Sequence, residues 1–114
     1  MIDQVGQETF ERLRLEMRRG VIVLAVLAQL RREHYGYSLR KALGERGVNI
    51  DEGTLYPLVR RLEQQGLLKS EWREEDKRKK RFYLMTASGR EVYDRLCEEW
   101  RQLNSGIRAL LEQR

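Results

Sequence analysis

The side chains best suited to chemistry in this sequence are cations, and they gather in two places. Arg60 and Arg61 are adjacent in GTLYPLVRRLEQQGLL (53–68), and five consecutive cations, Lys77 to Arg81, follow a short distance later. Guanidinium and ammonium groups bind phosphate oxygens, and arginine also pairs with the acceptor atoms on the edge of guanine. The two groups of cations therefore predict contact with an anionic partner and not covalent chemistry.

Catalytic chemistry has little support in the sequence. The chain holds one histidine, His34, and one cysteine, Cys97, so no Ser-His-Asp, Cys-His or zinc-binding set forms within it. It also lacks the glycine-rich loops of P-loop and dinucleotide-binding proteins. We expect no enzyme activity, no catalytic residue, no metal and no cofactor, and we expect His34 to be a solvated residue at a helix end.

Cysteine usage and hydropathy indicate the compartment. Cys97 has no partner for a disulfide within the chain, which suits a reducing cytoplasm. The apolar run VIVLAVLAQL (21–30) rises about 1.5 Å per residue, so it reaches roughly half of a ~30 Å hydrocarbon core. It also lacks the small-residue cleavage site of a signal peptide. We expect this run to be a buried helix in a cytoplasmic protein that does not bind membranes.

The net charge of +5 is concentrated in the middle of the chain. Residues 31–81 carry fourteen basic and nine acidic side chains, whereas the segments before and after them are balanced. A protein that meets a polyanion needs its cations on the element that makes contact. The middle of the chain is therefore the expected contact region.

Helices are expected ahead of this region. Residues 3–18 carry apolar side chains three and seven positions after Phe10, which predicts a short amphipathic helix. Residues 19–33 predict a second helix that is apolar on nearly all sides and lies at the centre of the domain. A third helix should end at Gly44 and Gly47, because glycine adopts the left-handed backbone at the lowest cost.

Segment 53–68 predicts a helix with two distinct faces. At 100° per residue, the buried stripe consists of Leu55, Leu58, Val59 and Leu62. The opposite side carries Gly53, Pro57, Arg60, Arg61 and Gln64, with Thr54 and Tyr56 on the flanks. Asp51 is expected to cap the helix through its side chain, and Gly66 is expected to end it. Pro57 predicts a slight bend or is a tolerated irregularity.

Two strands should follow this helix. Residues 67–73 and 80–86 alternate in character, which predicts a hairpin. The segment between them is almost entirely charged and contains no glycine for a tight two-residue turn. We therefore expect a longer, mobile loop, whose cations either meet an anion or serve only solubility.

The last segment predicts a helix capped by Thr86 or Ser88 with a heptad pattern of apolar residues. The two core positions of the heptad are occupied by Tyr93, Trp100 and Ile107 and by Leu96, Leu103 and Leu110. An apolar stripe on a helix that extends beyond its domain must be buried, and a two-fold copy of the same helix is the commonest solution. The alternative is a helix that folds back on its own domain.

Three helices followed by a hairpin with a basic tip are typical of a winged helix-turn-helix. The sequence thus predicts a mostly α fold with a small antiparallel β-hairpin and a C-terminal dimerisation helix. The predicted parts are an N-terminal amphipathic helix (1–18), the winged helix-turn-helix (19–86) and the dimerisation helix (87–114). In this fold the helix at 53–68, called the recognition helix, enters the major groove of double-stranded DNA. The hairpin formed by residues 67–73 and 80–86 with its connecting segment, called the wing, contacts phosphates or the minor groove.

The stretches YGYSLRKAL (35–43), GTLYPLVRRLEQQGLL (53–68) and RFYLMTASGR (81–90) resemble the PadR-like transcriptional regulators, in the short subclass with a single C-terminal helix. The resemblance covers nearly the whole chain from about residue 18. It implies a cytoplasmic homodimer, usually a repressor, that binds an inverted-repeat operator. Family wings commonly carry glycine where this chain has Asp76 and Lys77.

Pattern and resemblance together give a set of expected contact residues. The DNA-binding set is Tyr37, Gly53, Thr54, Tyr56, Pro57, Arg60, Arg61, Lys77, Arg78, Lys79 and Lys80. The resemblance places Tyr37 near the DNA backbone, and packing of Tyr37 against the recognition helix is the alternative. It also implies that a small planar aromatic effector stacks on Trp100 at the dimer interface, where simple packing is the alternative. An interaction module that acts through its last helix, without specific DNA binding, is the competing function.

Overall fold

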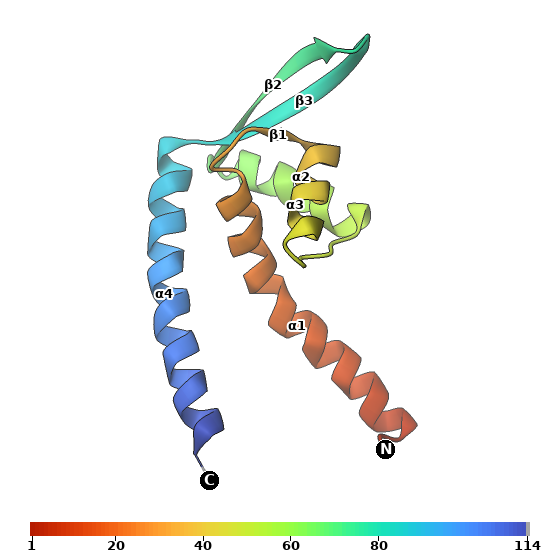
Figure 1. Cartoon of the computed structure of the whole chain (residues 1–114), viewed down its shortest axis with the longest axis vertical. Helices are drawn as coiled ribbons and strands as arrows, with labels where there is room; N and C mark the ends of the chain where they lie inside the picture. Colours follow the sequence, from red (N-terminus) through yellow and green to blue (C-terminus); the bar gives the residue numbers. More distant parts are fainter. Residues whose placement is uncertain (114) are drawn as a thin grey trace.

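The computed structural model describes residues 1–113 as four helices around a small three-stranded antiparallel sheet (Figure 1). The elements in chain order are α1 (Gln4–Gln29), β1 (His34–Tyr35), α2 (Gly36–Glu45), α3 (Glu52–Gln64), β2 (Leu68–Glu75), β3 (Arg78–Met85) and α4 (Ala87–Glu112). The expected winged helix-turn-helix with an additional C-terminal helix is confirmed. The dimerisation helix predicted over 87–114 includes Arg114, which lies outside the described residues.

The first helix corrects the sequence prediction. Residues 3–18 and 19–33 do not form two helices, because α1 runs without a break from Gln4 to Gln29. Asp3 caps it by accepting from the Gly6 amide at 2.7 Å. Gly20 in the helix interior costs only about 1 kcal/mol relative to alanine, so a single glycine does not end a helix of this length. The boundary predicted between residues 18 and 19 therefore falls inside one helix.

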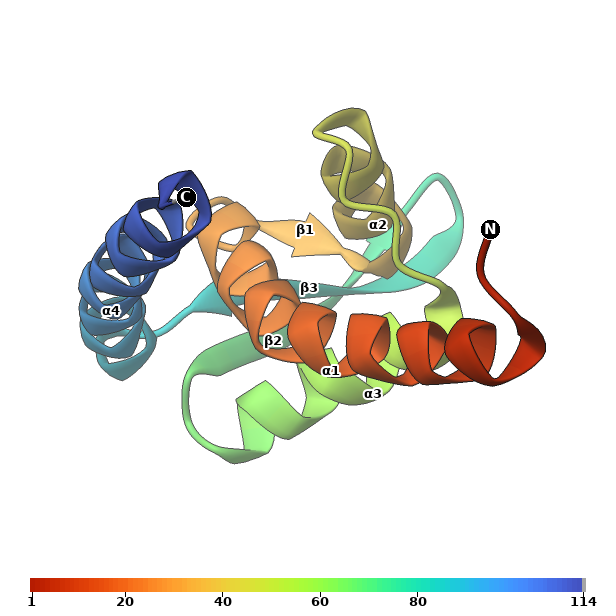
Figure 2. The ribbon, with the colours of Figure 1, turned by 90° about the horizontal axis from the view of Figure 1, so that it is seen from below.

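The core is built where α1, α2 and α3 meet the sheet. Its most deeply buried side chains are Val26, Leu27 and Leu30 at the end of α1, Leu39 of α2 and Leu55 of α3. The C-terminal half of α1 is thus central, as expected, whereas its N-terminal half projects away from the core (Figures 1 and 2).

Helix α3 carries the buried stripe that the spacing of its apolar residues predicts. Leu55, Leu58, Val59 and Leu62 are all buried, and Gly66, with φ of 82°, follows the helix end. Asp51 is the N-cap residue, but the predicted capping bond is wrong. Its carboxylate makes no bond to an amide of the first turn and instead accepts from the Thr54 hydroxyl at 2.9 Å.

The wing also differs from expectation. β2 and β3 pair up to Glu75 opposite Arg78, so the connection is a tight turn of two residues and not a long mobile loop. Asp76 and Lys77 both take positive φ, 53° and 65°, as a type I′ turn requires. Pairing of opposite charges across the last rungs, such as Glu75 with Arg78, favours a hairpin that stays closed up to its turn.

The sequence patterns did not predict the third strand of the sheet. His34 and Tyr35 pair with Tyr83 and Phe82, which gives the strand order β1-β3-β2. Two residues are too few to show an alternating pattern, so only tertiary pairing identifies them as a strand. β1 connects the end of α1 to the start of α2 at the base of the wing (Figure 1).

The last helix begins at a tightly packed joint. Thr86 caps α4 by accepting from the Gly89 amide at 3.0 Å, which confirms one of the two predicted caps. The Thr86 hydroxyl donates to the Gly66 carbonyl, and the Thr86 amide donates to the Leu67 carbonyl. From this joint α4 extends away from the wing, as does the N-terminal half of α1 (Figure 1). Within residues 1–113, no helix combines the length and apolar character that crossing a membrane requires.

Candidate nucleic-acid interface

The outer face of α3 is open to solvent. Thr54, Pro57, Arg60 and Arg61 are exposed, and Tyr56 is half-buried. The opposite face of the same helix is buried, so its backbone is held in place while these side chains project outward. The first turn of α3 lies beside Thr54, and the free amides and positive end of the helix dipole there favour an anion such as phosphate.

The five cations of the wing divide into two groups. Lys77, Arg78 and Lys79 are exposed at or near the turn. Lys80 turns towards the body, where its ammonium lies 3.2 Å from Glu75 and 4.4 Å from the centre of the Tyr35 ring. Only the first group is fully open to an external anion, although the sequence alone suggests one role for the whole run.

Arg81 belongs to the body of the protein and fixes the wing to the recognition helix. Its guanidinium donates to Glu63 of α3 at 2.7 Å and to Ser70 of β2 at 2.9 Å. The Ser70 hydroxyl donates to the same Glu63 carboxylate. These bonds connect α3, β2 and β3, so the exposed side chains of helix and wing keep a defined relative position.

A bidentate pair holds the other side of the wing. Arg73 of β2 donates to both carboxylate oxygens of Glu33 at 2.6 and 2.5 Å, and its guanidinium lies 4.7 Å from the centre of the Phe82 ring. The hydrogen bond from Arg73 lowers the pKa of the Glu33 carboxyl below its ordinary value. Because Glu33 lies between α1 and β1, this pair ties the wing to the connection that follows α1, in addition to its bonds with α3.

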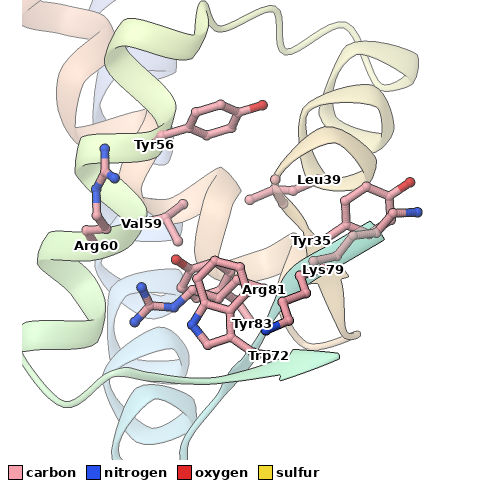
Figure 3. Close-up of a pocket in the computed structure, with 11 residues that line it drawn as sticks. Tyr35, Leu39, Tyr56, Val59, Arg60, Trp72, Lys79, Arg81 and Tyr83 are labelled. Carbon is pink, nitrogen blue, oxygen red and sulfur yellow. The ribbon is translucent and has the colours of Figure 1, made fainter. Parts of the chain in front are cut away.

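A cleft of about 390 Å³ separates α3 from the wing (Figure 3). Tyr56 and Arg60 lie on the α3 side, and Trp72 and Lys79 lie on the wing side. Trp72 is 63% exposed, and the sequence patterns indicated no role for it at the site. An aromatic residue in a partly alternating strand was the only available signal, and this signal does not distinguish a site residue from an ordinary surface residue.

Tyr37 at the start of α2 is 61% exposed. Its ring stacks on Tyr35, with 6.5 Å between the ring centres. It lines a shallow cavity of about 620 Å³ together with Arg40 and Lys41. The ring is therefore largely open to solvent, and its expected contact with the DNA backbone stays a prediction.

His34 is not the solvated helix-end residue that the sequence predicted. It lies half-buried in β1, and its two ring nitrogens are 2.9 and 3.0 Å from the side chains of Gln29 and Ser38. Burial, with a further contribution from the charge of Arg32, lowers its pKa below the ordinary value. The neutral ring accepts from the Gln29 amide and donates to the Ser38 hydroxyl, so it helps to hold the start of α2.

The predicted dimer residues lie on the face of α4 that the core leaves uncovered. Those exposed are Leu96, Trp100, Leu103, Ile107 and Leu110. Tyr93, in contrast, is partly buried against the core, and the guanidinium of Arg31 lies 5.4 Å from the centre of its ring. The start of the heptad thus packs on the body of the protein, and the rest is only partly covered by residues 1–113.

A cavity of about 600 Å³ lies between α1 and α4. Trp100 and Ile107 line it from α4, and Met17 and Val21 line it from α1. The two helices flank this space as they leave the body (Figures 1 and 2). Both therefore contribute to one unfilled apolar groove, which we call the α1–α4 groove. No cluster of histidine, cysteine or acidic side chains within residues 1–113 has the composition to hold a metal ion.

Comparison with known proteins identifies relatives of this arrangement. Residues 23–95 match the sequence profile of the transcriptional regulator PadR-like family. The transcriptional regulator Rv3488 of Mycobacterium tuberculosis (strain ATCC 25618 / H37Rv) is 37% identical over 97 residues, which are 84% of this chain and 88% of that protein.

Solved structures extend the similarity to nearly the whole chain. A PadR family transcriptional regulator from Eggerthella lenta DSM 2243 is 40% identical, with a TM-score of 0.85 over 98% of this chain and 100% of that chain. A PadR-like transcription factor from Bacteroides fragilis is 28% identical, with a TM-score of 0.74 over 87% of this chain and 98% of that chain.

Proposed function

This chain belongs to the PadR-like family of transcriptional regulators, and we propose that it is a cytoplasmic homodimeric repressor that binds an inverted-repeat operator. The family establishes DNA-binding regulation as the general role. The operator symmetry, the sign of regulation and the residues in contact with DNA are the proposed part.

One observation carries this proposal: Arg60 and Tyr56 of α3 and the exposed Lys79 of the wing border the same cleft. Arg60 projects from a helix whose opposite face is buried, and Lys79 lies across the cleft on the wing. A helix of this size fits the major groove, and a wing beside it reaches the neighbouring backbone. Arg60 and Tyr56 are the proposed readers of base edges.

Sequencing the DNA fragments that the purified protein retains tests the proposal directly. We expect a motif with two-fold symmetry and half-sites about one duplex turn, roughly 34 Å, apart. Affinity for that motif should fall steeply as salt rises, by about 0.9 in the slope of log K against log salt for each phosphate contact.

Two matched variants separate base reading from phosphate binding. Arg60→Ala should relax sequence preference at one position of each half-site, at a cost of about 1–3 kcal/mol. Lys79→Ala should weaken all sequences alike and reduce the salt slope. Competition binding over a panel of operator variants measures both, and a sequence-selective loss in Lys79→Ala would contradict the proposed role of the wing.

The homodimer is proposed from the α1–α4 groove. The exposed apolar residues of α4 repeat at heptad spacing, and a second copy related by a two-fold axis would cover them. Two copies would also present two recognition helices to one operator.

Release by a small planar effector is proposed from Trp100, which is 44% exposed and lines the α1–α4 groove. Its indole offers a flat surface on which an aromatic compound stacks. Planar compounds should therefore quench Trp100 fluorescence in a Trp72→Phe variant. A protein-protein interaction module is the alternative function, and it predicts weak DNA binding with no preferred site.

A further inference from the structure

We propose that the cleft between α3 and the wing is a ligand site for a planar aromatic ring joined to a phosphate dianion, of which a nucleoside monophosphate is the simplest case. The cleft is distinct from the α1–α4 groove, because the two share no lining residue. Three observations support the site: the size of the cleft, the exposed indole of Trp72 and the two cations without an ion-pair partner.

The size suits a small molecule. The cleft measures about 390 Å³, within the roughly 300–1,000 Å³ typical of sites for small ligands. Its lining includes the buried side chains of Leu39 and Val59, and its walls belong to α3, the wing, β1 and the start of α2. The bonds from Arg81 to Glu63 and Ser70 hold these walls at a fixed separation, so the cleft is formed before any ligand arrives.

Among the aromatic rings that line the cleft, Trp72 is the most exposed. The Lys80 ammonium lies 4.4 Å from the centre of the Tyr35 ring, and the Arg81 guanidinium lies 5.5 Å from the centre of the Tyr83 ring and 5.8 Å from that of Trp72. Tyr56 is half-buried and packs against the core. Trp72 and Tyr56 border the cleft from opposite walls (Figure 3). The largely exposed indole of Trp72 leaves a wide apolar surface in water, and a stacked planar ring would cover it.

The cations of the cleft divide into paired and unpaired ones. Lys80 is paired with Glu75, and Arg81 is paired with Glu63. Within residues 1–113, neither Arg60 nor Lys79 has an ion-pair partner, and no acidic side chain lines the cleft. Two uncompensated positive charges match a phosphate monoester, which carries about −1.5 to −2 at pH 7, better than they match a singly charged group.

Duplex DNA does not explain the aromatic part of this site. In a duplex the bases are stacked on one another, so a protein meets phosphates, sugars and base edges but few free ring faces. Stacking on an aromatic side chain requires an unstacked base, and a free nucleotide supplies one.

Occupancy by such a ligand would compete with the operator. Tyr56, Arg60 and Lys79 belong both to this cleft and to the proposed DNA contacts, so the ligand and the DNA would need the same side chains. This regulatory consequence rests on the proposed function, whereas ligand binding itself does not.

The test uses the full chain with Trp100→Phe, in which Trp72 is the remaining tryptophan. Titration with AMP or GMP should change Trp72 fluorescence with saturation. Adenosine supplies the ring without the charge, and inorganic phosphate supplies the charge without the ring. Each half alone should bind more weakly by roughly tenfold or more, the usual effect of losing one stacking or one charge-assisted contact.

Matched variants locate the site. Arg60→Ala should weaken AMP binding by roughly tenfold or more, whereas Arg61→Ala should leave it unchanged, because Arg61 does not line the cleft. Isothermal titration calorimetry measures AMP binding without relying on tryptophan fluorescence, so it applies to Trp72→Phe as well. Circular dichroism verifies that each variant is folded. Equal binding to wild type and Arg60→Ala, equal binding of phosphate and AMP, or no saturable binding up to millimolar AMP would each overturn the proposal.

Separate measurements keep this inference distinct from the proposed function. If AMP binds through Trp72 and Arg60 but no DNA motif is retained, the ligand site stands and the repressor proposal fails. If a specific operator is bound and AMP is not, the repressor proposal stands and the ligand site fails. If both bind, AMP should release the operator from wild-type protein over the concentrations that saturate Trp72, and retention of the operator would exclude competition.

Discussion

At the scale of single residues, chemically similar side chains have different roles. Arg60 and Arg81 border the same cleft, yet Arg81 is bound to Glu63 while Arg60 is exposed. Lys79 and Lys80 are neighbours on β3, and the alternation of a strand sends one outward and the other towards the body. Substitution of Arg60 or Lys79 therefore tests binding, whereas substitution of Arg81 or Lys80 also disturbs the fold.

His34 makes stability depend on pH. Its pKa is lowered in the folded state, chiefly by burial, so between about pH 6.5 and that lower value the unfolded chain binds more protons than the folded one. The contribution of His34 is therefore complete above about pH 6.5 and is lost as pH falls through the folded pKa. Urea unfolding of the wild type from neutral to mildly acidic pH should show this decline.

The variant His34→Gln tests the assignment, because glutamine retains hydrogen-bonding groups but does not titrate. Its unfolding free energy should vary less with pH than that of the wild type over the same range. A variant with undiminished pH dependence would assign the effect to other groups.

At the scale of elements, the joint at the start of α4 fixes the direction of the long helix. Gly89 is buried beneath the Leu67 carbonyl, and a Cβ atom at this position would lie 2.0 Å from that oxygen. Because this contact would be with a backbone oxygen, the clash is relieved only if α4 or the α3–β2 connection moves. The position of the groove-lining residues farther along α4 therefore depends on this one close approach.

Gly89→Ala should destabilise the protein by roughly 1–3 kcal/mol or more, the typical cost of overpacking. Gly106→Ala in the same helix is the matched control, since within residues 1–113 no atom beyond its chain neighbours and the adjacent helix backbone lies within 4 Å of the added methyl group. That control should be neutral or stabilising by about 0.5–1 kcal/mol. Chemical denaturation compares the two, and equal stabilities would show that α4 is not held at this joint.

At the scale of the whole molecule, the two long helices leave an apolar groove that residues 1–113 do not fill. Ile107 in this groove is 51% exposed, and exposed apolar patches of this kind mark association sites. The proposed dimer accounts for the groove and would hold two recognition helices at a fixed separation.

Ile107→Glu should raise the dimer dissociation constant by roughly two orders of magnitude or more, because each of the two copies would place an unpaired carboxylate in the seam. Ser105→Glu introduces the same charge at an exposed position of α4 outside the heptad core and should have little effect. Sedimentation velocity measures both variants. A stable dimer of Ile107→Glu would exclude this groove as the interface.

The sequence by itself determined the features that depend on local spacing. The buried stripe of α3, Gly66 at its end, a cap at Thr86 or Ser88 and the order of helices and hairpin all follow from periodicity and from residues within one or two turns. The outward position of Arg60 was predictable for the same reason, because burial of one helix face fixes where the other face points.

Only the tertiary structure decided the features that depend on distant partners. The tight turn at Asp76 and Lys77 is held by cross-strand pairing, and β1 exists because β3 offers it an edge. The separation of Arg81 from the open cations depends on Glu63, which is 18 residues away in the chain. Trp72 became part of a cleft only when the wing folded beside α3, since no local pattern records which surface will face it.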